Sequence, residues 1–181
     1  MRTRYVLAVL TAAVGFVAGC GSVGQKAGAP PSAGSAAIPS PHTASAVPKE
    51  LDFTAKTVDG SDFSGASLAG KPAVLWFWAP WCPVCQGEAP DIAEAAHDHP
   101  RVTFVGVAAL DQLPAMQSFA NKYGVGVFTN IADVSGAVWQ RFGVTAQPAF
   151  AFVGADGAVE VVRRSVSEPE LGTRVSALAN T

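Results

Sequence analysis

Residues 73–90, AVLWFWAPWCPVCQGEAP, carry the strongest structural signal in this chain. The stretch begins as an apolar run, passes through two cysteines that are separated by two residues, Cys82 and Cys85, and continues as a helix-like segment. The continuous apolar run predicts a central strand over 73–78 that is covered on both faces. Two cysteines placed where a strand gives way to a helix predict a thiol–disulfide redox centre.

The start of the predicted helix makes the two cysteines unequal. If Cys82 is the N-cap, Pro83 falls at the first helical position, where its fixed φ fits the helix. The Cys82 sulfur then faces the free N–H groups and the positive dipole end of the first turn, which favour a thiolate. Cys85 shares an apolar helical stripe with Ala89 and Ile92 and should face the core, whereas Cys82 is expected at the exposed tip. We therefore expect Cys82 to attack and Cys85 to resolve.

The motif resembles a known family. Trp-x-x-Trp-Cys-x-x-Cys after an apolar strand, with Pro90 five residues beyond Cys85, is similar to the thioredoxin superfamily. Glu88, three residues after the second cysteine, is typical of the TlpA/ResA/DsbE branch, and WAPWCPVC resembles actinobacterial extracytoplasmic proteins of the DsbE/DsbF type. The resemblance covers residues 50–181 and implies a thioredoxin fold with an N-terminal β-hairpin before the core.

Hydrophobic patterns along the rest of the chain predict the same α/β architecture. An early hairpin is expected between residues 51 and 63, around Asp59-Gly60. Strands alternating with helices, followed by a closing hairpin and a last helix, describe a mixed central sheet flanked by helices on both faces. We expect helices over 83–99, 111–123, 135–142 and 168–178, and further strands over 102–108, 127–131, 149–153 and 158–162.

Pro148 lies just before the predicted strand 149–153, where the thioredoxin family has a cis-proline opposite its cysteine pair. The resemblance therefore implies a cis Gln147–Pro148 bond, although only about one X–Pro bond in twenty is cis in folded proteins. A proline there offers no N–H to the sulfurs, and the Gln147 carbonyl can accept a bond from an extended substrate. The expected substrate groove is lined by Pro80, Trp81, Pro83, Val84 and Gln147.

Glu88 is the candidate proton acceptor for Cys85. Thioredoxin has a buried Asp at the strand position that Trp76 occupies in this chain, so the usual internal acceptor is missing. Glu88 lies one helical turn beyond Cys85 and is a candidate replacement. Two alternatives stay open, namely that Glu88 is solvated or that it favours the helix N-terminus.

The N-terminal residues have the layout of an export signal. Arg2 and Arg4 precede a short apolar stretch that is followed by Val17-Ala18-Gly19-Cys20, which resembles a bacterial lipobox. The resemblance implies a lipoprotein signal peptide over 1–19, cleavage before Cys20 and attachment of lipid to its sulfur. The alternatives are an ordinary secretory signal with an incidental cysteine and an anchor that stays uncut.

Residues 20–49 are rich in Gly, Ala, Ser and Pro and are predicted to be a flexible tether that begins at the lipidated cysteine. The domain over 50–181 would then be anchored at the outer face of the cytoplasmic membrane. Within 50–181, eight Lys and Arg against fourteen Asp and Glu leave a formal charge of −6, and no basic run occurs. This charge balance argues against nucleic acid as a partner. We expect a monomer.

These features predict an extracytoplasmic thiol–disulfide oxidoreductase whose redox group is the Cys82–Cys85 disulfide, with no separate cofactor and no metal. The resemblance implies an oxidase for reduced or unfolded exported proteins, reoxidised by a membrane partner of the VKOR or DsbB kind. The main alternative is a reductase in cytochrome c maturation, with a CcdA-like partner. A Sco-type copper carrier is less favoured. Proteins of that type carry a CxxxC motif and a distant His ligand, whereas the two cysteines here are separated by two residues and no His lies near Pro148. A non-catalytic binding lipoprotein is a further alternative.

Overall fold

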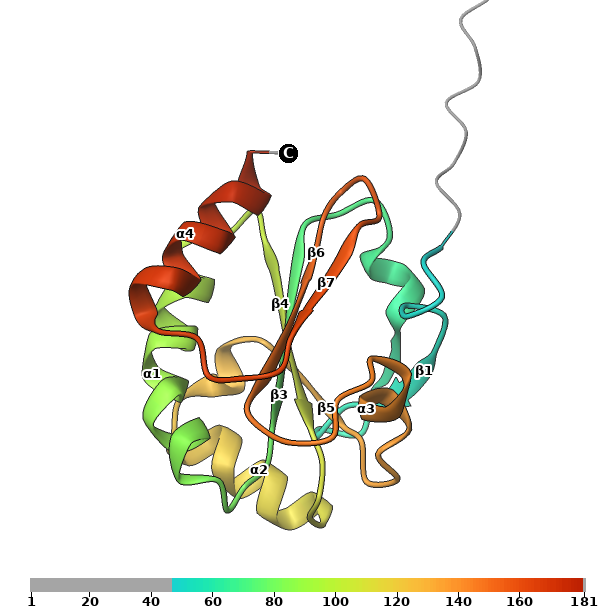
Figure 1. Ribbon diagram of the computed structural model, residues 1–181. Helices are drawn as coiled ribbons and strands as arrows, with labels where there is room; N and C mark the ends of the chain where they lie inside the picture. The colour runs from blue at the N-terminus through green and yellow to red at the C-terminus, as the bar shows by residue number, and fades with distance from the viewer. Residues whose placement is uncertain (1–46, 181) are drawn as a thin grey trace, which may run out of the picture. The chain divides into compact units, whose positions relative to one another are not determined.

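The centre of the fold is a five-stranded sheet, seen in a computed structural model that describes residues 47–180 (Figure 1). The predicted export signal, Cys20 and most of the predicted tether lie outside the described residues. The strand order is β5-β4-β3-β6-β7, in which β5, β4 and β3 run parallel and β6 and β7 are antiparallel. The strands are β3 (Ala73–Trp78), β4 (Thr103–Ala108), β5 (Thr129–Ala132), β6 (Ala149–Val153) and β7 (Val159–Val162).

Helices cover both faces of this sheet, so the predicted mixed sheet flanked by helices is confirmed (Figure 1). Side chains from α1, α2 and α4 share one core cluster with Trp76 and Trp78 of β3. Side chains from α3 and the N-terminal part of the domain share the other cluster with Leu75 and Phe77. The helices are α1 (Pro83–Asp98), α2 (Leu113–Lys122), α3 (Ala137–Arg141) and α4 (Glu168–Ala179), and the two 3-10 helices are η1 (Gly65–Leu68) and η2 (Val125–Val127).

The continuous apolar sequence of β3 explains why this strand is central. Every residue from Ala73 to Trp78 is buried, because successive side chains point to opposite faces and each face is covered. The early hairpin is also confirmed: β1 (Thr54–Lys56) and β2 (Asp62–Ser64) form a separate antiparallel pair.

Several predicted boundaries were wrong by one or two residues, including the start of α2, which was expected at residue 111 and lies at Leu113, and two of the differences have a clear local reason. The helix expected from residue 135 begins at Ala137, since Gly136 has a left-handed φ of 72°. The strand expected from residue 127 begins at Thr129, because Val125–Val127 form a 3-10 turn.

A buried amide that the sequence analysis did not single out joins the ends of three elements. Asn130 of β5 is buried, and its Oδ1 accepts the indole N–H of Trp78 at 3.3 Å. Its Nδ2 donates to the carbonyls of Val125 at 2.8 Å and Phe128 at 2.9 Å. The amide thus satisfies polar groups that would otherwise be buried without partners, and it fixes β5 against the end of β3.

Candidate active site

The cysteine pair lies at the N-terminus of α1, as predicted. Cys82 and Cys85 form a disulfide, with their Cα atoms 5.3 Å apart. Cys82 is the N-cap, with φ −78° and ψ 112°, and Pro83 occupies the first turn. The backbone N–H of Cys85 donates to the Sγ of Cys82 at 3.1 Å. The sulfur therefore occupies the position at which a helix N-terminus stabilises negative charge.

The prediction that the Cys82 side chain is exposed was wrong. Cys82 is 3% exposed and Cys85 is fully buried, and both belong to the same core cluster. The N-cap places the Cys82 backbone at the tip of the helix, but its sulfur turns inward to Cys85 and to the Cys85 N–H. The exposed side chains at this tip are those of Trp81, which is 53% exposed, and Val84, which is 50% exposed. Cys82 retains only a slight advantage in accessibility.

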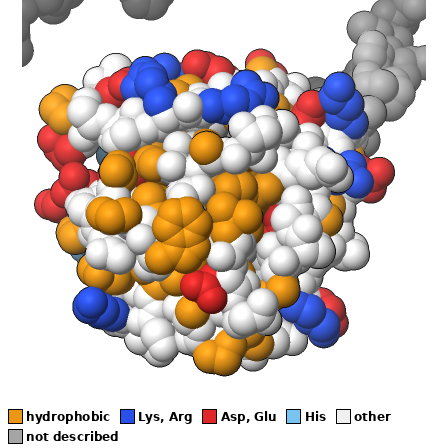
Figure 2. All heavy atoms as spheres, turned by 60° about the horizontal axis from the view of Figure 1, so that its bottom comes forward, with side chains coloured by type: hydrophobic (Ala, Val, Ile, Leu, Met, Phe, Trp, Pro, Cys, Tyr) orange, Lys and Arg blue, Asp and Glu red, His pale blue; other side chains and the backbone are white. Residues whose placement is uncertain are grey.

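An apolar surface surrounds the cysteine pair. Because β3, β4 and β5 are parallel, their carboxyl ends meet at one edge of the sheet, and exposed apolar residues follow each end. Figure 2 shows hydrophobic side chains gathered on the face that includes this edge. We define the apolar surface as Trp81, Val84, Leu110, Leu113 and Val134.

Trp81 is fixed on this surface by a hydrogen bond. Its indole N–H donates to the carbonyl of Leu110 at 3.1 Å. Leu110, which follows β4, has a left-handed φ of 62° and an exposed side chain. The predicted groove contained Trp81 and Val84 but not Leu110 or Leu113. The signal that could have indicated them is the pair of apolar residues in the short connection after the predicted buried strand 102–108, next to the edge that carries the cysteines.

Pro148 lies at the same edge of the sheet. The Gln147–Pro148 bond is cis, as the resemblance implied. The antiparallel register pairs Ala149 with Phe77, so Pro148 lies level with Trp78, the last residue of β3. Trp78 is four residues before Cys82 in the sequence. Pro148 is buried and Gln147 is half-buried. Of the other predicted groove residues, Pro83 is exposed, while Pro80 is half-buried and its carbonyl accepts a bond from Gln86 at 3.3 Å.

Glu88 is half-buried, and its carboxylate has protein partners. Its Oε2 accepts the indole N–H of Trp76 at 3.4 Å, and its Oε1 accepts the hydroxyl of Ser165. Burial raises the pKa of Glu88 above its ordinary value, and the charge of Asp91 adds to the rise. Hydrogen bonding from Ser165, Trp76 and the Val166 backbone lowers the pKa, but by less than burial and Asp91 together raise it. The open alternative of a merely solvated Glu88 does not fit these contacts.

The described residues, 47–180, contain neither a metal-binding cluster nor a membrane-spanning helix. No group of three or more His, Cys, Asp or Glu between residues 47 and 180 could hold a metal ion. Over the same residues, no helix is long and apolar enough to cross a membrane.

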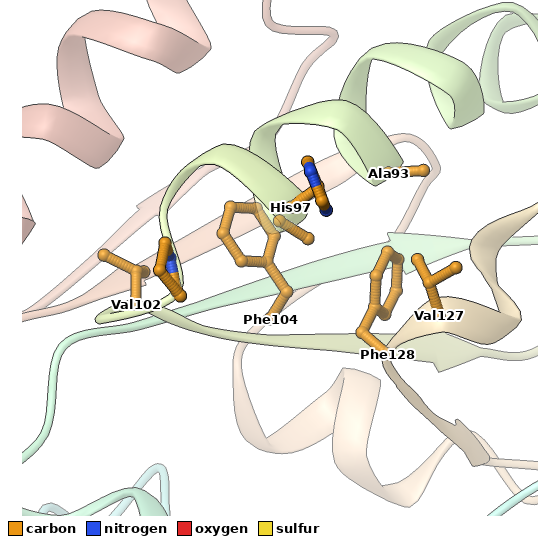
Figure 3. A pocket seen from close by; sticks show the side chains of 8 residues that line it. Ala93, His97, Val102, Phe104, Val127 and Phe128 are labelled. Atoms are coloured by element: carbon orange, nitrogen blue, oxygen red, sulfur yellow. The ribbon is translucent and has the colours of Figure 1, made fainter.

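A groove of about 550 Å³ lies away from the cysteines, between the C-terminal half of α1 and the η2 region (Figure 3). Neither cysteine lines it, so it is not part of the redox site. The side chains labelled in Figure 3 are Ala93, His97, Val102, Phe104, Val127 and Phe128.

A mixed sheet of this topology with a disulfide across the first turn of its first long helix defines a thioredoxin-fold thiol–disulfide oxidoreductase. The family model described as the AhpC/TSA family matches residues 47–162. The chain belongs to this thioredoxin-like family, and it is an oxidoreductase of the DsbE/DsbF type.

Several known proteins resemble the chain closely. The soluble secreted antigen MPT53 of Mycobacterium tuberculosis is 49% identical over 138 residues, which cover 75% of this chain and 79% of MPT53. The structure of M. tuberculosis DsbF in mixed oxidised and reduced forms has a TM-score of 0.73 and 64% identity, covering 74% of this chain and 99% of DsbF. A secreted M. tuberculosis disulfide oxidoreductase homologous to E. coli DsbE has a TM-score of 0.68 and 51% identity, covering 71% and 98% of the two chains.

Proposed function

We propose that this protein is a thiol oxidase that forms disulfides in reduced, unfolded exported proteins. The observation that carries the proposal is the position of Cys82 at the N-cap of α1, where its Sγ accepts the Cys85 N–H. The same N–H and the helix dipole would stabilise a Cys82 thiolate after the disulfide has been reduced. Stabilising the reduced form makes a disulfide a stronger oxidant.

The proposed reaction is two successive thiol–disulfide exchanges. A substrate thiolate attacks the Sγ of Cys82, the Cys82–Cys85 bond breaks, and Cys85 leaves as a thiolate that takes up a proton. A second substrate thiolate then attacks the substrate sulfur in the mixed disulfide and releases Cys82. The substrate loses two electrons and gains a disulfide, and the protein gains the two electrons in its dithiol. A membrane partner of the VKOR or DsbB kind would reoxidise it.

The apolar surface supports unfolded proteins as the substrates. Trp81 precedes the cysteine pair and Val84 lies between the two cysteines, while the exposed Leu110, Leu113 and Val134 follow the ends of β4 and β5 at the same edge of the sheet. Exposed apolar side chains that gather on one face are typical of sites that bind other proteins. An unfolded substrate offers apolar segments beside its reduced cysteines, whereas a folded protein has buried most of them.

The second candidate is a reductase of the kind used in cytochrome c maturation, reduced by a CcdA-like partner. The observation that favours it is Glu88, because a half-buried carboxylate one turn beyond Cys85 disfavours a nearby thiolate when it is ionised. Oxidative refolding separates the two candidates. The oxidised protein should accelerate disulfide formation in a reduced, unfolded test protein, and Cys82→Ser should not. Reduction of insulin disulfides without any effect on refolding would instead support the reductase.

We also propose export and lipidation at Cys20, which would hold the domain at the outer face of the cytoplasmic membrane. The lipobox-like residues 17–20 support the proposal, and the secreted relatives support export. Mass spectrometry of the protein purified from membranes should find a mature N-terminus at Cys20 that carries a diacylglyceryl group. Cys20→Ser should lose this modification. An unmodified mature N-terminus at another residue would contradict lipidation, although it would leave export intact.

A further inference from the structure

The segment between β7 and α4, residues 163–167, contacts the Glu88 carboxylate, which also contacts β3. Trp76 of β3 donates to one carboxylate oxygen, and the hydroxyl of Ser165 donates to the other. We propose that Ser165 is a positioning residue that holds the Glu88 carboxylate in its charged form and in a fixed orientation beside Cys85. The proposal rests on the proposed function, to which it adds that the charged Glu88 carboxylate accepts the proton of the Cys85 thiol when Cys85 attacks a mixed disulfide at Cys82 during reoxidation.

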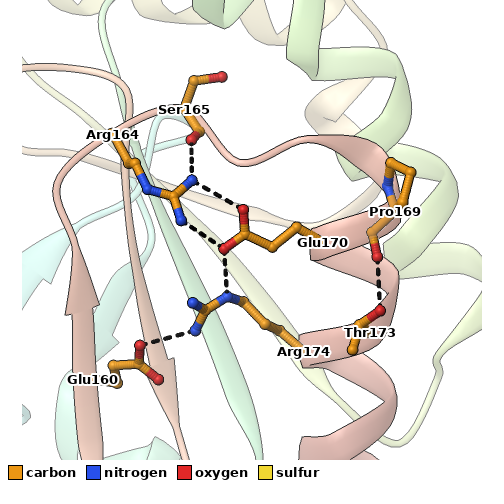
Figure 4. A network of polar contacts seen from close by, with 7 residues as sticks. All are labelled: Glu160, Arg164, Ser165, Pro169, Glu170, Thr173 and Arg174. Atoms are coloured by element: carbon orange, nitrogen blue, oxygen red, sulfur yellow. Dashed lines mark hydrogen bonds and ion pairs between the residues drawn. The ribbon is translucent and has the colours of Figure 1, made fainter.

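The backbone of this segment is anchored by a network of ion pairs (Figure 4). Arg164 donates to the Ser165 carbonyl at 2.8 Å and makes two bonds to the Glu170 carboxylate, at 2.8 and 2.9 Å. Arg174 bridges Glu170 and Glu160, with both bonds at 2.9 Å. Hydrogen bonds from Arg164 and Arg174 lower the pKa of Glu170 to about 2, so the network stays charged at neutral pH.

The next residue, Val166, is buried in the core cluster that also contains Cys85. Its backbone acts on Glu88 in the same direction as the Ser165 hydroxyl and lowers the pKa of the carboxyl. Ser165 is thus held from both sides, by the Arg164 contact to its carbonyl and by the buried side chain that follows it. A hydroxyl on such a backbone is well placed to orient a carboxylate, because little conformational freedom is left to lose.

The groups around Glu88 define how it should titrate. From α1, Asp91 brings a negative charge, and Cys85 brings a thiol when the protein is reduced. From β3, Trp76 brings only an indole N–H, and the segment 163–167 brings the Ser165 hydroxyl and the Val166 backbone. Arg164 is turned toward Glu170. Ser165 is therefore the only side chain with a hydroxyl among these partners, and its bond opposes the effect of burial.

Three variants test the inference. Ser165→Ala removes the hydroxyl at an exposed position, and Ser165→Thr keeps a hydroxyl. Ser167→Ala is the matched control, because Ser167 lies in the same segment, is exposed, and makes no side-chain cap bond to α4. The first measurement is the titration midpoint of the Glu88 carboxyl carbon by NMR in the oxidised protein. The second is the pH profile of Cys85-dependent resolution of a glutathione mixed disulfide.

In Ser165→Ala, the midpoint of Glu88 and the pH profile should both move to higher pH, whereas both should stay near the wild-type values in Ser165→Thr and Ser167→Ala. An unchanged Glu88 midpoint in Ser165→Ala would overturn the inference, and so would a shifted midpoint with an unchanged pH profile. Failure of the proposed function would look different: the wild-type protein would not accelerate oxidative refolding, while the Glu88 midpoint would still depend on Ser165.

Discussion

A Cys85→Ser variant should accumulate mixed disulfides with its substrates, and a Cys82→Ser variant should accumulate none. In Cys85→Ser, the Cys82 thiolate can still attack a disulfide of an oxidised substrate, which is the reverse of the proposed oxidation, but no second sulfur is present to release the complex. In Cys82→Ser, the sulfur that accepts the helix N–H is lost, so exchange should fall to the uncatalysed background. Non-reducing gel electrophoresis with mass spectrometry of the trapped species measures both outcomes.

A second variant controls for the burial of Cys85. Cys85 is fully buried, so a serine hydroxyl there could disturb the core as well as remove the sulfur. Cys85→Ala removes the sulfur without adding a polar group and should trap the same mixed disulfides. If instead Cys82→Ser traps substrates through Cys85, the assignment of attacking and resolving cysteines is reversed.

A Gly106→Ala substitution should destabilise the fold by about 3 kcal/mol, a large fraction of the total stability of a typical domain. Gly106 lies in β4 between Trp76 and Asn130 in the strand register. A Cβ at this position would overlap the side chains of Asn130 and Trp78. The methyl group would therefore both overpack the sheet and separate the buried Trp78–Asn130 hydrogen bond.

Urea unfolding of the oxidised protein measures this effect, with Gly126→Ala as the matched control. At Gly126 the nearest atom to an added Cβ, apart from its chain neighbours, is the Ala120 carbonyl oxygen at 3.8 Å, so that variant should change the unfolding free energy by less than about 1 kcal/mol. A wild-type unfolding midpoint for Gly106→Ala would mean that the close packing of Asn130 on β4 contributes little to stability.

The sequence allowed the fold and the redox pair to be predicted because both depend on local patterns. The apolar run of β3, the N-cap of α1 and the position of Pro148 each lie within a few residues of the signal that indicates them. The exposure of Cys82 was predicted wrongly because it depends on residues that are distant in the sequence: the side chain lies in a core cluster with residues of β3, α2 and α4. The local pattern placed the sulfur at the helix N-terminus correctly but did not show what covers it.

Contacts between residues that are far apart in the chain could not be predicted from one sequence alone. Ser165 and Glu88 are 77 positions apart, and Asn130 and Trp78 are 52 apart. A serine in a loop and an asparagine in a short strand are each compatible with many exposed positions. Only the folded arrangement of α1, β3, β5 and the segment 163–167 brings these polar groups to buried or half-buried partners, where they can influence stability and titration.

The reduction potential of the Cys82–Cys85 pair, measured in glutathione redox buffers, tests most directly whether the protein is an oxidase. Stabilisation of the Cys82 thiolate by the N-terminus of α1 predicts a potential clearly less negative than that of thioredoxin, about −270 mV, and displaced toward that of DsbA, about −120 mV. A potential as negative as that of thioredoxin, or more so, would contradict the proposed oxidase and support the reductase.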